Sequence, residues 1–294
     1  MQGDNLKNYL HLHFIVFVWG FTAVLGKLIT LGALPLVWFR MCIAVALMLV
    51  YAMVAKSPFK ISGKTFIKFM LAGGIIALHW LTFYHAIKIS NISITLACLS
   101  TGAFFASFLE PLLYGRKIIF YEVIFGLMVI CGLYIIFHFQ GNFLAGMLTA
   151  LTSALLSTIF AIINGKFAKE YNPVTISFYE LLGGIFFFSV YLFFSGQFTP
   201  AFFALTPRDW LWLFILGSVC TAYAQIAAVQ VMKTITPYTM MLTINLEPVY
   251  GIILALLVFK DNEKMGYSFY LGAAIILITV ILNGIFKNRT QAAN

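Results

Sequence analysis

Charged residues are scarce in this sequence, in which they account for only 9% of the 294 residues. Soluble globular domains usually carry about 25% charged residues, so the composition argues against a soluble enzyme or a soluble binding domain. The net charge of +9 is dispersed along the chain, and no run of basic residues reaches five. We therefore expect no nucleic-acid partner.

Motifs for catalysis and for metal binding are also lacking. The four cysteines, Cys42, Cys98, Cys131 and Cys220, all fall in apolar stretches and form no C-x-x-C pair. This pattern favours small buried side chains over a disulfide framework or a metal site. The sequence contains no P-loop, no H-E-x-x-H and no G-x-S-x-G motif. We expect neither enzymatic activity nor a cofactor, and no ATP hydrolysis by this chain.

Long apolar runs, in contrast, fill most of the chain. Hydrophobic residues make up 62% of it, and the mean hydropathy is +0.99. About 20 apolar residues in a helix cross the hydrocarbon core of a bilayer, and the runs are continuous, unlike the alternating strands of a membrane barrel. Ten such spans are predicted: Tyr9 to Ile29, Pro35 to Val54, Phe66 to Ile87, Ile92 to Tyr114, Ile119 to Phe139, Phe143 to Gly165, Pro173 to Phe194, Trp210 to Met232, Pro237 to Phe259 and Gly266 to Phe286.

Basic residues are distributed unequally between the two sides that these spans define. The side of the N-terminus holds 12 of the 18 Lys and Arg residues, and the opposite side holds 4. Because cytoplasmic loops carry the excess of basic residues, we expect both termini in the cytoplasm. A multi-pass protein of the bacterial inner membrane fits this pattern.

The two halves of the chain repeat each other at offsets between about 138 and 146 residues. The matching pairs are Tyr121-x4-Gly126 with Tyr267-x4-Gly272, Gly26-Lys27-Leu28 with Gly165-Lys166-Phe167, Pro35 and Phe39 with Pro173 and Phe178, and Ala86-Ile87-Lys88 with Val231-Met232-Lys233. With five spans each, residues 1–140 and 141–294 would enter the membrane from opposite sides. Inverted repeats of this kind are common in secondary transporters, whose substrate site lies near the midplane.

The sequence resembles the EamA-type members of the drug/metabolite transporter superfamily over nearly its whole length. The resemblance is carried by Trp19-Gly20-x6-Lys27, Arg40, Asp209-Trp210, Glu247-Pro248-Val249 and Gly272. It implies an all-α membrane protein with ten transmembrane helices in two inverted five-helix repeats around a central cavity. Relatives export amino acids, other metabolites or drugs, or move nucleotide-sugars and phosphorylated sugars.

Polar residues inside the spans form stripes at helical spacing. The stripes are Thr149, Ser153, Ser157 and Asn164 in span six; Ser100, Ala103, Ser107 and Glu110 in span four; and Ser218, Thr221 and Gln225 in span eight. Small and hydroxylated residues also permit close packing of helices. Each stripe therefore has two interpretations, a packing face or a cavity lining.

Span three carries a cluster of polar and aromatic residues, His79, Trp80, Phe83, Tyr84 and His85. One interpretation is a histidine that is hydrogen-bonded to a neighbouring helix. The other is an aromatic, hydrogen-bonding wall for an organic substrate.

Charged residues within spans are costly and tend to face the helix bundle or a cavity. Glu180 and Glu247 could pair with Arg40, Lys27 or a histidine and stabilise the fold. Alternatively, a protonatable glutamate could couple transport to protons. Lys27, near a span end, could also extend to the interface.

We predict a secondary transporter that exports small organic metabolites, including amino acids, by alternating access around a midplane cavity. A membrane enzyme acting on lipids and a non-transporting receptor or assembly factor are the alternatives. The expected partners are a small-molecule substrate and the lipid bilayer, and a monomer is compatible with the sequence. The predicted substrate-binding residues are Trp19, His79, Trp80, Tyr84, Ser100, Asn164, Gln225 and Asn245, and the candidates for charge or coupling are Lys27, Arg40, Glu180 and Glu247.

Overall fold

A computed structural model describes residues 2–115, 120–139, 143–235, 240, 243, 244, 246–260 and 265–292. These residues are largely helical and contain no β-strand. The helices are α1 (Gln2–Leu28), α2 (Ala33–Val54), α3 (Gly63–Ile89), α4 (Ile92–Leu99), α5 (Gly102–Tyr114), α6 (Phe120–Phe139), α7 (Leu144–Glu170), α8 (Pro173–Phe194), α9 (Pro200–Phe203), α10 (Pro207–Gly217), the π-helix η2 (Ser218–Tyr223), α11 (Ala224–Val231), α13 (Glu247–Phe259) and α14 (Tyr267–Ala292).

Seven helical stretches within the described residues are long and apolar enough to cross a membrane. They are Leu6–Leu28, Ala33–Val54, Gly63–Ile89, Ile92–Leu113, Leu144–Glu170, Pro173–Phe194 and Pro207–Val231. Shorter apolar helices, Ile124–Ile136, Glu247–Phe259 and Tyr267–Thr279, fall in the other three predicted spans. The chain is therefore a multi-pass membrane protein. Seven of the ten predicted crossings are present as full-length spans among the described residues, and the number ten stays a prediction.

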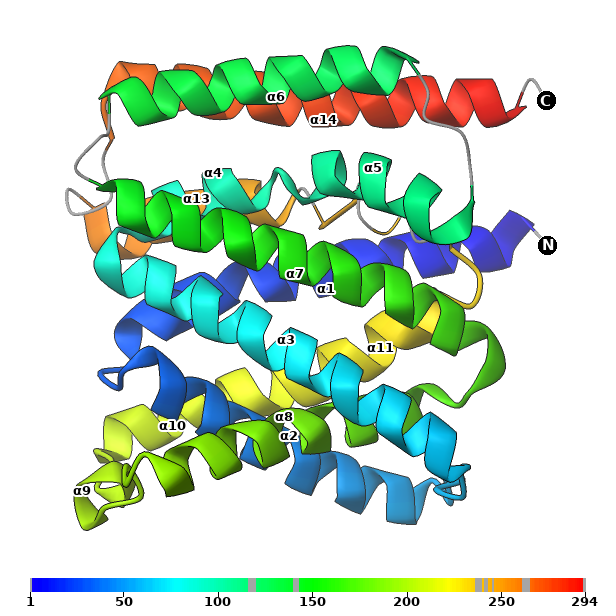
Figure 1. The fold of residues 1–294 in the computed structure, drawn as a ribbon, viewed down its shortest axis with the longest axis vertical. Coiled ribbons are helices and arrows are strands. Elements are labelled where there is room, and N and C mark those ends of the chain that lie inside the picture. Colours follow the sequence, from blue (N-terminus) through cyan, green and yellow to red (C-terminus); the bar gives the residue numbers. More distant parts are fainter. Residues whose placement is uncertain are drawn as a thin grey trace.

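The helices are stacked along the longest axis of the molecule, from the α6–α14 pair to the layer that contains α2, α8 and α10 (Figure 1). Helix α3 packs against both α7 and α8, and α1 packs against α13, which places these helices around the centre. Figure 1 also shows that α1 begins and α14 ends at the same end of the bundle. An even number of crossings would produce this arrangement.

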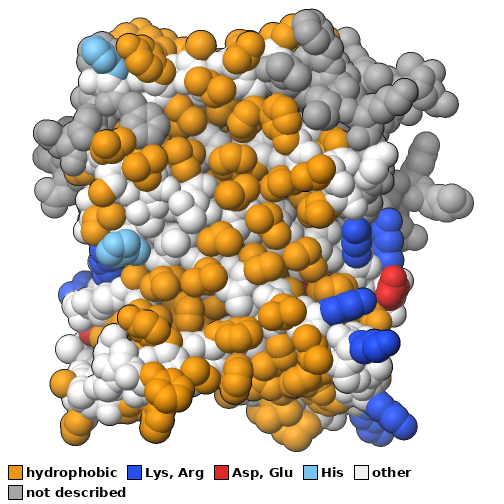
Figure 2. All heavy atoms as spheres, viewed as in Figure 1, with side chains coloured by type: hydrophobic (Ala, Val, Ile, Leu, Met, Phe, Trp, Pro, Cys, Tyr) orange, Lys and Arg blue, Asp and Glu red, His pale blue; other side chains and the backbone are white. Residues whose placement is uncertain are grey.

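Hydrophobic side chains cover the middle of the face shown in Figure 2, and Lys and Arg side chains gather at its two edges. More of them lie at the right-hand edge, the end at which Figure 1 places both termini. An apolar band between two polar rims is the surface that a bilayer requires, because its hydrocarbon core cannot solvate charges.

Two predicted spans are interrupted rather than continuous. The fourth breaks into α4 and α5 at Ser100 and Thr101, and the eighth runs from α10 through η2 into α11. A π-helix inside an α-helix often marks a functional position. Here it changes the rotation of the second half of the span, and this rotation determines which side chains reach the centre.

Asp209 ties the start of α10 to the end of the first span. Its carboxylate accepts hydrogen bonds from the Thr30 backbone N–H at 2.8 Å, from the Thr30 hydroxyl at 2.7 Å and from the Thr206 hydroxyl at 2.8 Å. Thr206 in turn caps α10 by accepting from the Asp209 N–H. Hydrogen bonds to a charged group are worth about 1.5–3 kcal/mol each.

We expect Asp209→Ala to lower the free energy of unfolding in detergent by about 3 kcal/mol, because the Thr30 and Thr206 donors lose their acceptor. Chemical unfolding followed by circular dichroism measures the change. Glu170→Ala, at an exposed carboxylate, serves as the control. A loss for Asp209→Ala that is no larger than for this control would contradict the anchoring role.

Candidate functional site

A cavity lies at the centre of the bundle, between helices from both halves of the chain. It is lined from α1, α2, α3, α4, α7, α11 and α13 and from the segments next to α11 and α13. The lining residues are Trp19, Thr22, Arg40, Ile76, His79, Trp80, Phe83, Leu99, Ser157, Phe160, Ala161, Asn164, Gln225, Ala228, Val229, Met232, Met240, Ile244 and Glu247.

The lining combines aromatic and aliphatic side chains with a few polar groups, as is usual for small-molecule sites. The free volume of the cavity is about 80 Å³. A single water needs roughly 10–15 Å³ by this measure. The cavity therefore has room for several waters or for a small polar ligand.

Arg40 supplies the cationic group of the cavity, and its position is fixed by contacts from two other helices. Only 2% of its surface is exposed. Its Nε donates to the Thr221 hydroxyl at 2.6 Å, and its Nη1 donates to the Tyr84 hydroxyl at 2.8 Å. The guanidinium also lies 3.9 Å from the centre of the Trp80 ring. A desolvated guanidinium held by hydrogen bonds and by an aromatic face is pre-organised for recognition of an anionic group.

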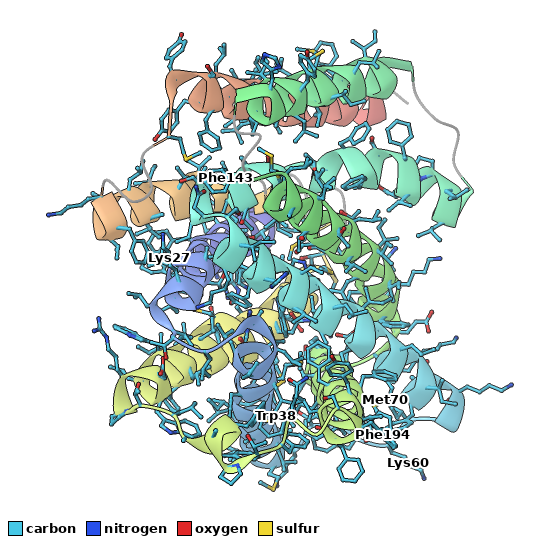
Figure 3. The ribbon with its side chains drawn as sticks, turned by 60° about the vertical axis from the view of Figure 1, so that its left-hand side comes forward. Lys27, Trp38, Lys60, Met70, Phe143 and Phe194 are labelled. Carbon is cyan, nitrogen blue, oxygen red and sulfur yellow. The ribbon has the colours of Figure 1, made fainter. Side chains whose placement is uncertain are left out.

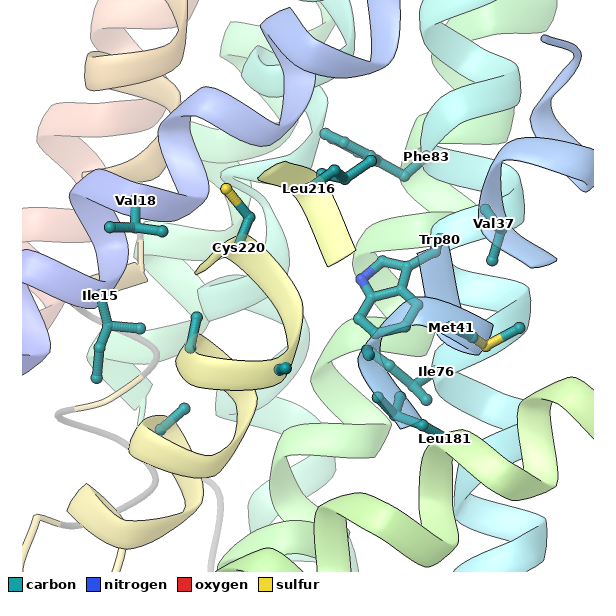
Figure 4. Close-up of a cluster of buried hydrophobic side chains, with 14 of the residues drawn as sticks. Ile15, Val18, Val37, Met41, Ile76, Trp80, Phe83, Leu181, Leu216 and Cys220 are labelled. Atoms are coloured by element: carbon teal, nitrogen blue, oxygen red, sulfur yellow. The ribbon is translucent and has the colours of Figure 1, made fainter. Parts of the chain in front are cut away.

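The local structure explains how these partners converge on Arg40. Thr221 lies within η2, and its hydroxyl also donates to the Leu216 carbonyl five residues earlier at 2.6 Å. Trp80 lies among aliphatic side chains that include Met41, Ile76 and Leu181 (Figure 4). The π-helical turn therefore holds one edge of the guanidinium, and the packed indole covers one of its faces.

Glu247 supplies a carboxyl group on another wall of the same cavity. It is the first residue of α13, where the helix dipole favours a carboxylate. Among the described residues, neither an ion pair within 4.0 Å nor a hydrogen bond links Glu247 to Arg40, although both side chains line the cavity. The cavity thus presents a guanidinium group and a carboxyl group that are not in direct contact.

His79 is hydrogen-bonded to a neighbouring helix and also lines the cavity. Its Nδ1 lies 2.9 Å from the Ser153 carbonyl oxygen and 2.8 Å from the Ser153 hydroxyl, which also donates to the His79 carbonyl at 3.0 Å. These bonds fix the ring, so its Nε2 edge is the part that a ligand could reach. The two interpretations of this histidine, a packing contact and a cavity wall, are both realised by one side chain.

Asn164 and Gln225 form the amide part of the lining, and Glu180 lies directly behind them. Asn164 Nδ2 donates to Glu180 Oε1 at 2.9 Å, and Gln225 lies beside the same carboxyl group. Glu180 is fully buried and is not itself a lining residue. The carboxyl group of Glu180 therefore lies behind the cavity wall and is connected to the cavity by its hydrogen bond with Asn164.

The structure brings together Trp19, His79, Trp80, Asn164 and Gln225 of the predicted substrate-binding residues. Tyr84 contributes indirectly, through its hydrogen bond to Arg40. Ser100 is not among the lining residues, because it stands at the break between α4 and α5 and its hydroxyl donates to the Ala97 carbonyl at 2.6 Å. Asn245 lies outside the described residues.

The four residues proposed for charge or coupling occupy different environments. Arg40 and Glu247 line the cavity, and Glu180 lies behind it. Lys27 is found at the end of α1 beside α13 (Figure 3), and its Nζ lies 4.7 Å from the centre of the Phe259 ring. Lys27 is half-buried and is not among the residues that line the cavity, so its extension toward the interface stays a prediction.

Several lining residues were not predicted from the sequence. Thr22 follows Trp19 by three residues on α1, so helical spacing alone could have placed it on the same face. Met232 and Met240 gave no polar signal, yet flexible thioethers often fill adaptable binding surfaces. Among the residues that the structure describes, no group of three His, Cys, Asp or Glu side chains is arranged to hold a metal ion.

The model of the EamA-like transporter family matches residues 7–138 and again residues 144–285. The chain belongs to the EamA-like transporter family. A solved structure, described only as the crystal structure of a protein, has a TM-score of 0.68 to this chain at 14% sequence identity. The match covers 94% of this chain and 97% of that one, so the likeness concerns the fold as a whole. No curated protein matches the sequence.

Proposed function

We propose that this EamA-like transporter is a secondary transporter that exports small zwitterionic metabolites, such as amino acids, across a bacterial inner membrane. The observation that carries the proposal is the placement of Arg40 and Glu247 on the walls of one cavity without direct contact between them. A substrate with a carboxylate and an ammonium group would complement both residues. Aromatic residues such as Trp19 and Phe160 would contact its apolar part.

Alternating access supplies the mechanism in this proposal. The two halves, inserted as inverted five-helix repeats, rock against each other around the cavity and open it to one side at a time. Both termini lie in the cytoplasm, and a monomer suffices because all lining residues come from one chain. Support comes from the family match in both halves and from the basic residues near the end of the bundle that holds both termini.

Transport by purified protein in liposomes tests the proposal directly. Labelled amino acids should move down their own gradient, and an excess of unlabelled substrate on the opposite side should accelerate the exchange. A protein that moves no candidate metabolite under any gradient would contradict the assignment. Cysteines introduced at Ser157 and Gln225, after replacement of the four native ones, should react with aqueous reagents from one side of the membrane or the other.

We expect Glu247→Gln to remove the preference for an amino acid over the matching acid that lacks the amino group. The wild-type protein should favour the amino acid by about 10- to 100-fold, because a charge-assisted hydrogen bond in a desolvated site is worth about 1.5–3 kcal/mol. Competition of both compounds against a labelled substrate measures this ratio. Glu170→Gln, at an exposed carboxylate, should leave the ratio unchanged, and a ratio that is also unchanged in Glu247→Gln would refute the role of Glu247.

A further inference from the structure

Glu180 is an acidic residue in the interior of the bundle. Its side chain is fully buried on α8, a helix that packs against α2, α3, α7 and α11. Within the described part of the chain, no Lys, Arg or His nitrogen lies within 4.0 Å of its carboxyl group. An isolated carboxylate in such a place is strongly disfavoured, because nothing replaces its hydration.

The hydrogen bonds around Glu180 leave two buried oxygens without a donor. Asn164 Nδ2 donates to Glu180 Oε1 at 2.9 Å, which aligns the amide with the carboxyl group. Within the described residues, the other oxygens of the same two groups, Asn164 Oδ1 and Glu180 Oε2, are buried and have no hydrogen-bond partner. The Gln225 amide lies beside the carboxyl group but makes no hydrogen bond to Oε2. Both accept hydrogen bonds when the carboxyl group is ionised, and neither can then donate one.

One proton on Glu180 satisfies both oxygens at once. A carboxylic acid donates through its O–H, so Oε2–H can bond to Asn164 Oδ1 while Asn164 Nδ2–H bonds to Oε1. The result is a closed acid–amide pair with two hydrogen bonds and no net charge. We propose that Glu180 and Asn164 form a proton-binding site behind the cavity wall, with the proton held between Oε2 and Oδ1.

The neighbouring titratable and charged groups are committed to other partners. On α2, Arg40 bonds to Thr221 and Tyr84; on α3, Tyr84 accepts from Arg40, and His79 bonds to Ser153. Helix α11 carries no titratable residue between Ala224 and Val231. Helix α7 carries Lys166 and Lys169, which are exposed near the C-terminal end of that helix. The proton is therefore the group that neutralises Glu180 in this conformation.

Asn164 connects this site to the ligand, and this second step rests on the proposed transport function. Because Asn164 also lines the cavity, a ligand that hydrogen-bonds to its amide competes with Glu180 for the same group. Opening of the acid–amide pair breaks the Oε2–H bond to Oδ1, and the proton leaves Oε2 for water in the cavity. Ligand binding and proton release thereby become linked, as in a proton–substrate exchanger.

The helix starts and helix crossings of the two halves give Glu180 a counterpart. Helices α2 and α8 each contain 22 residues; Arg40 lies seven residues after Ala33, and Glu180 lies seven residues after Pro173. Gly217 faces the backbone carbonyl of Arg40, as Gly73 faces that of Glu180. The equivalent helix crossings therefore hold different groups in the two halves. Arg40 lines the cavity in the first half, and Glu180 lies behind the cavity wall in the second. If the halves exchange conformations during transport, Glu180 takes the cavity-lining position that Arg40 has here.

Infrared difference spectroscopy tests the proton site without any substrate. The purified wild-type protein at neutral pH should show one more protonated-carboxyl band than Glu180→Gln, and deuterium oxide should shift this band. Glu180→Gln is expected to fold, because its carboxamide supplies the missing donor to Asn164 Oδ1. Asn164→Ala should keep the band but move it toward the frequency of a free carboxylic acid. Identical carboxyl regions in the wild type and Glu180→Gln would overturn the proposal.

A second measurement tests the linkage to ligand. Addition of a transported amino acid to wild-type protein in weakly buffered detergent solution should acidify the medium, as reported by a pH indicator dye. Glu180→Gln should bind the ligand without acidifying the medium. Acidification by both proteins would overturn the linkage, although the infrared band would still report the proton site. If no amino acid binds to either protein, the result counts against the transport function alone. We do not expect sodium to stabilise the site that we propose. If sodium, but not choline, stabilises the wild type and this effect is lost in Glu180→Gln, the site binds a metal cation instead of a proton, and the proposal is overturned.

Discussion

Replacement of Arg40 by lysine is expected to reduce transport at least about 100-fold, although the positive charge is retained. A lysine ammonium has three N–H donors but no planar fork, so it cannot place donors where Nε and Nη1 meet Thr221 and Tyr84 while a planar group stacks on Trp80. The misplaced ammonium would lose one charge-assisted hydrogen bond to the substrate carboxylate and the pre-organised geometry, which amounts to about 3 kcal/mol, or about two orders of magnitude in affinity.

The experiment compares Arg40→Lys with Arg208→Lys, at an exposed arginine in the first turn of α10. Both variants should be expressed and remain monodisperse in detergent, and only the first should lose substrate affinity, as measured by concentration-dependent uptake. Equal affinities for Arg40→Lys and the wild type would show that the guanidinium geometry does not matter for recognition. A loss of folded protein would instead assign Arg40 a structural role.

The position of helix α8 was predictable from the sequence because local signals mark its start. Helix α8 has the predicted bounds because Asn172 caps its first turn and Pro173 stands at its first position. The stripe of α7 was predicted as well, but the structure divides its use: Ser153 bonds to His79, whereas Ser157 and Asn164 line the cavity. Sequence periodicity identifies the face of a helix but not the neighbour that each part of the face meets.

The parts of the site that could not be predicted depend on long-range contacts or on local breaks in helices. The partners of Arg40 are 44 and 181 residues away in the sequence, so no pattern links them. Ser100 fits a regular helical stripe, but the interruption at Ser100 and Thr101 ends that periodicity, and its hydroxyl satisfies a carbonyl of its own helix. The sequence identified Glu180 as an ionisable residue inside an apolar span. Its position behind Asn164 depends on how the helices pack and could not be predicted.

The close approach of α3 and α8 predicts a second large effect, a severe loss of folded protein in Gly73→Ala. A methyl group at Gly73 would overlap the backbone carbonyl of Glu180 and approach the Gly184 nitrogen to 3.0 Å. Backbone atoms cannot rotate away as a side chain can, so the two helices would have to separate. Small residues permit such contacts between membrane helices, and we expect a cost above about 3 kcal/mol.

Gly63→Ala is the matched control, because it makes the same change on the same helix with no neighbouring atom within 4 Å. Alanine favours a helix over glycine by up to about 1 kcal/mol, so intrinsic propensity would make both variants more stable. A lower yield and a lower melting temperature in detergent for Gly73→Ala alone would therefore measure the packing of α3 on α8. Equal stability of the two variants would mean that α3 and α8 are farther apart than described. The carboxyl group of Glu180 would then no longer be held against the cavity wall by this contact.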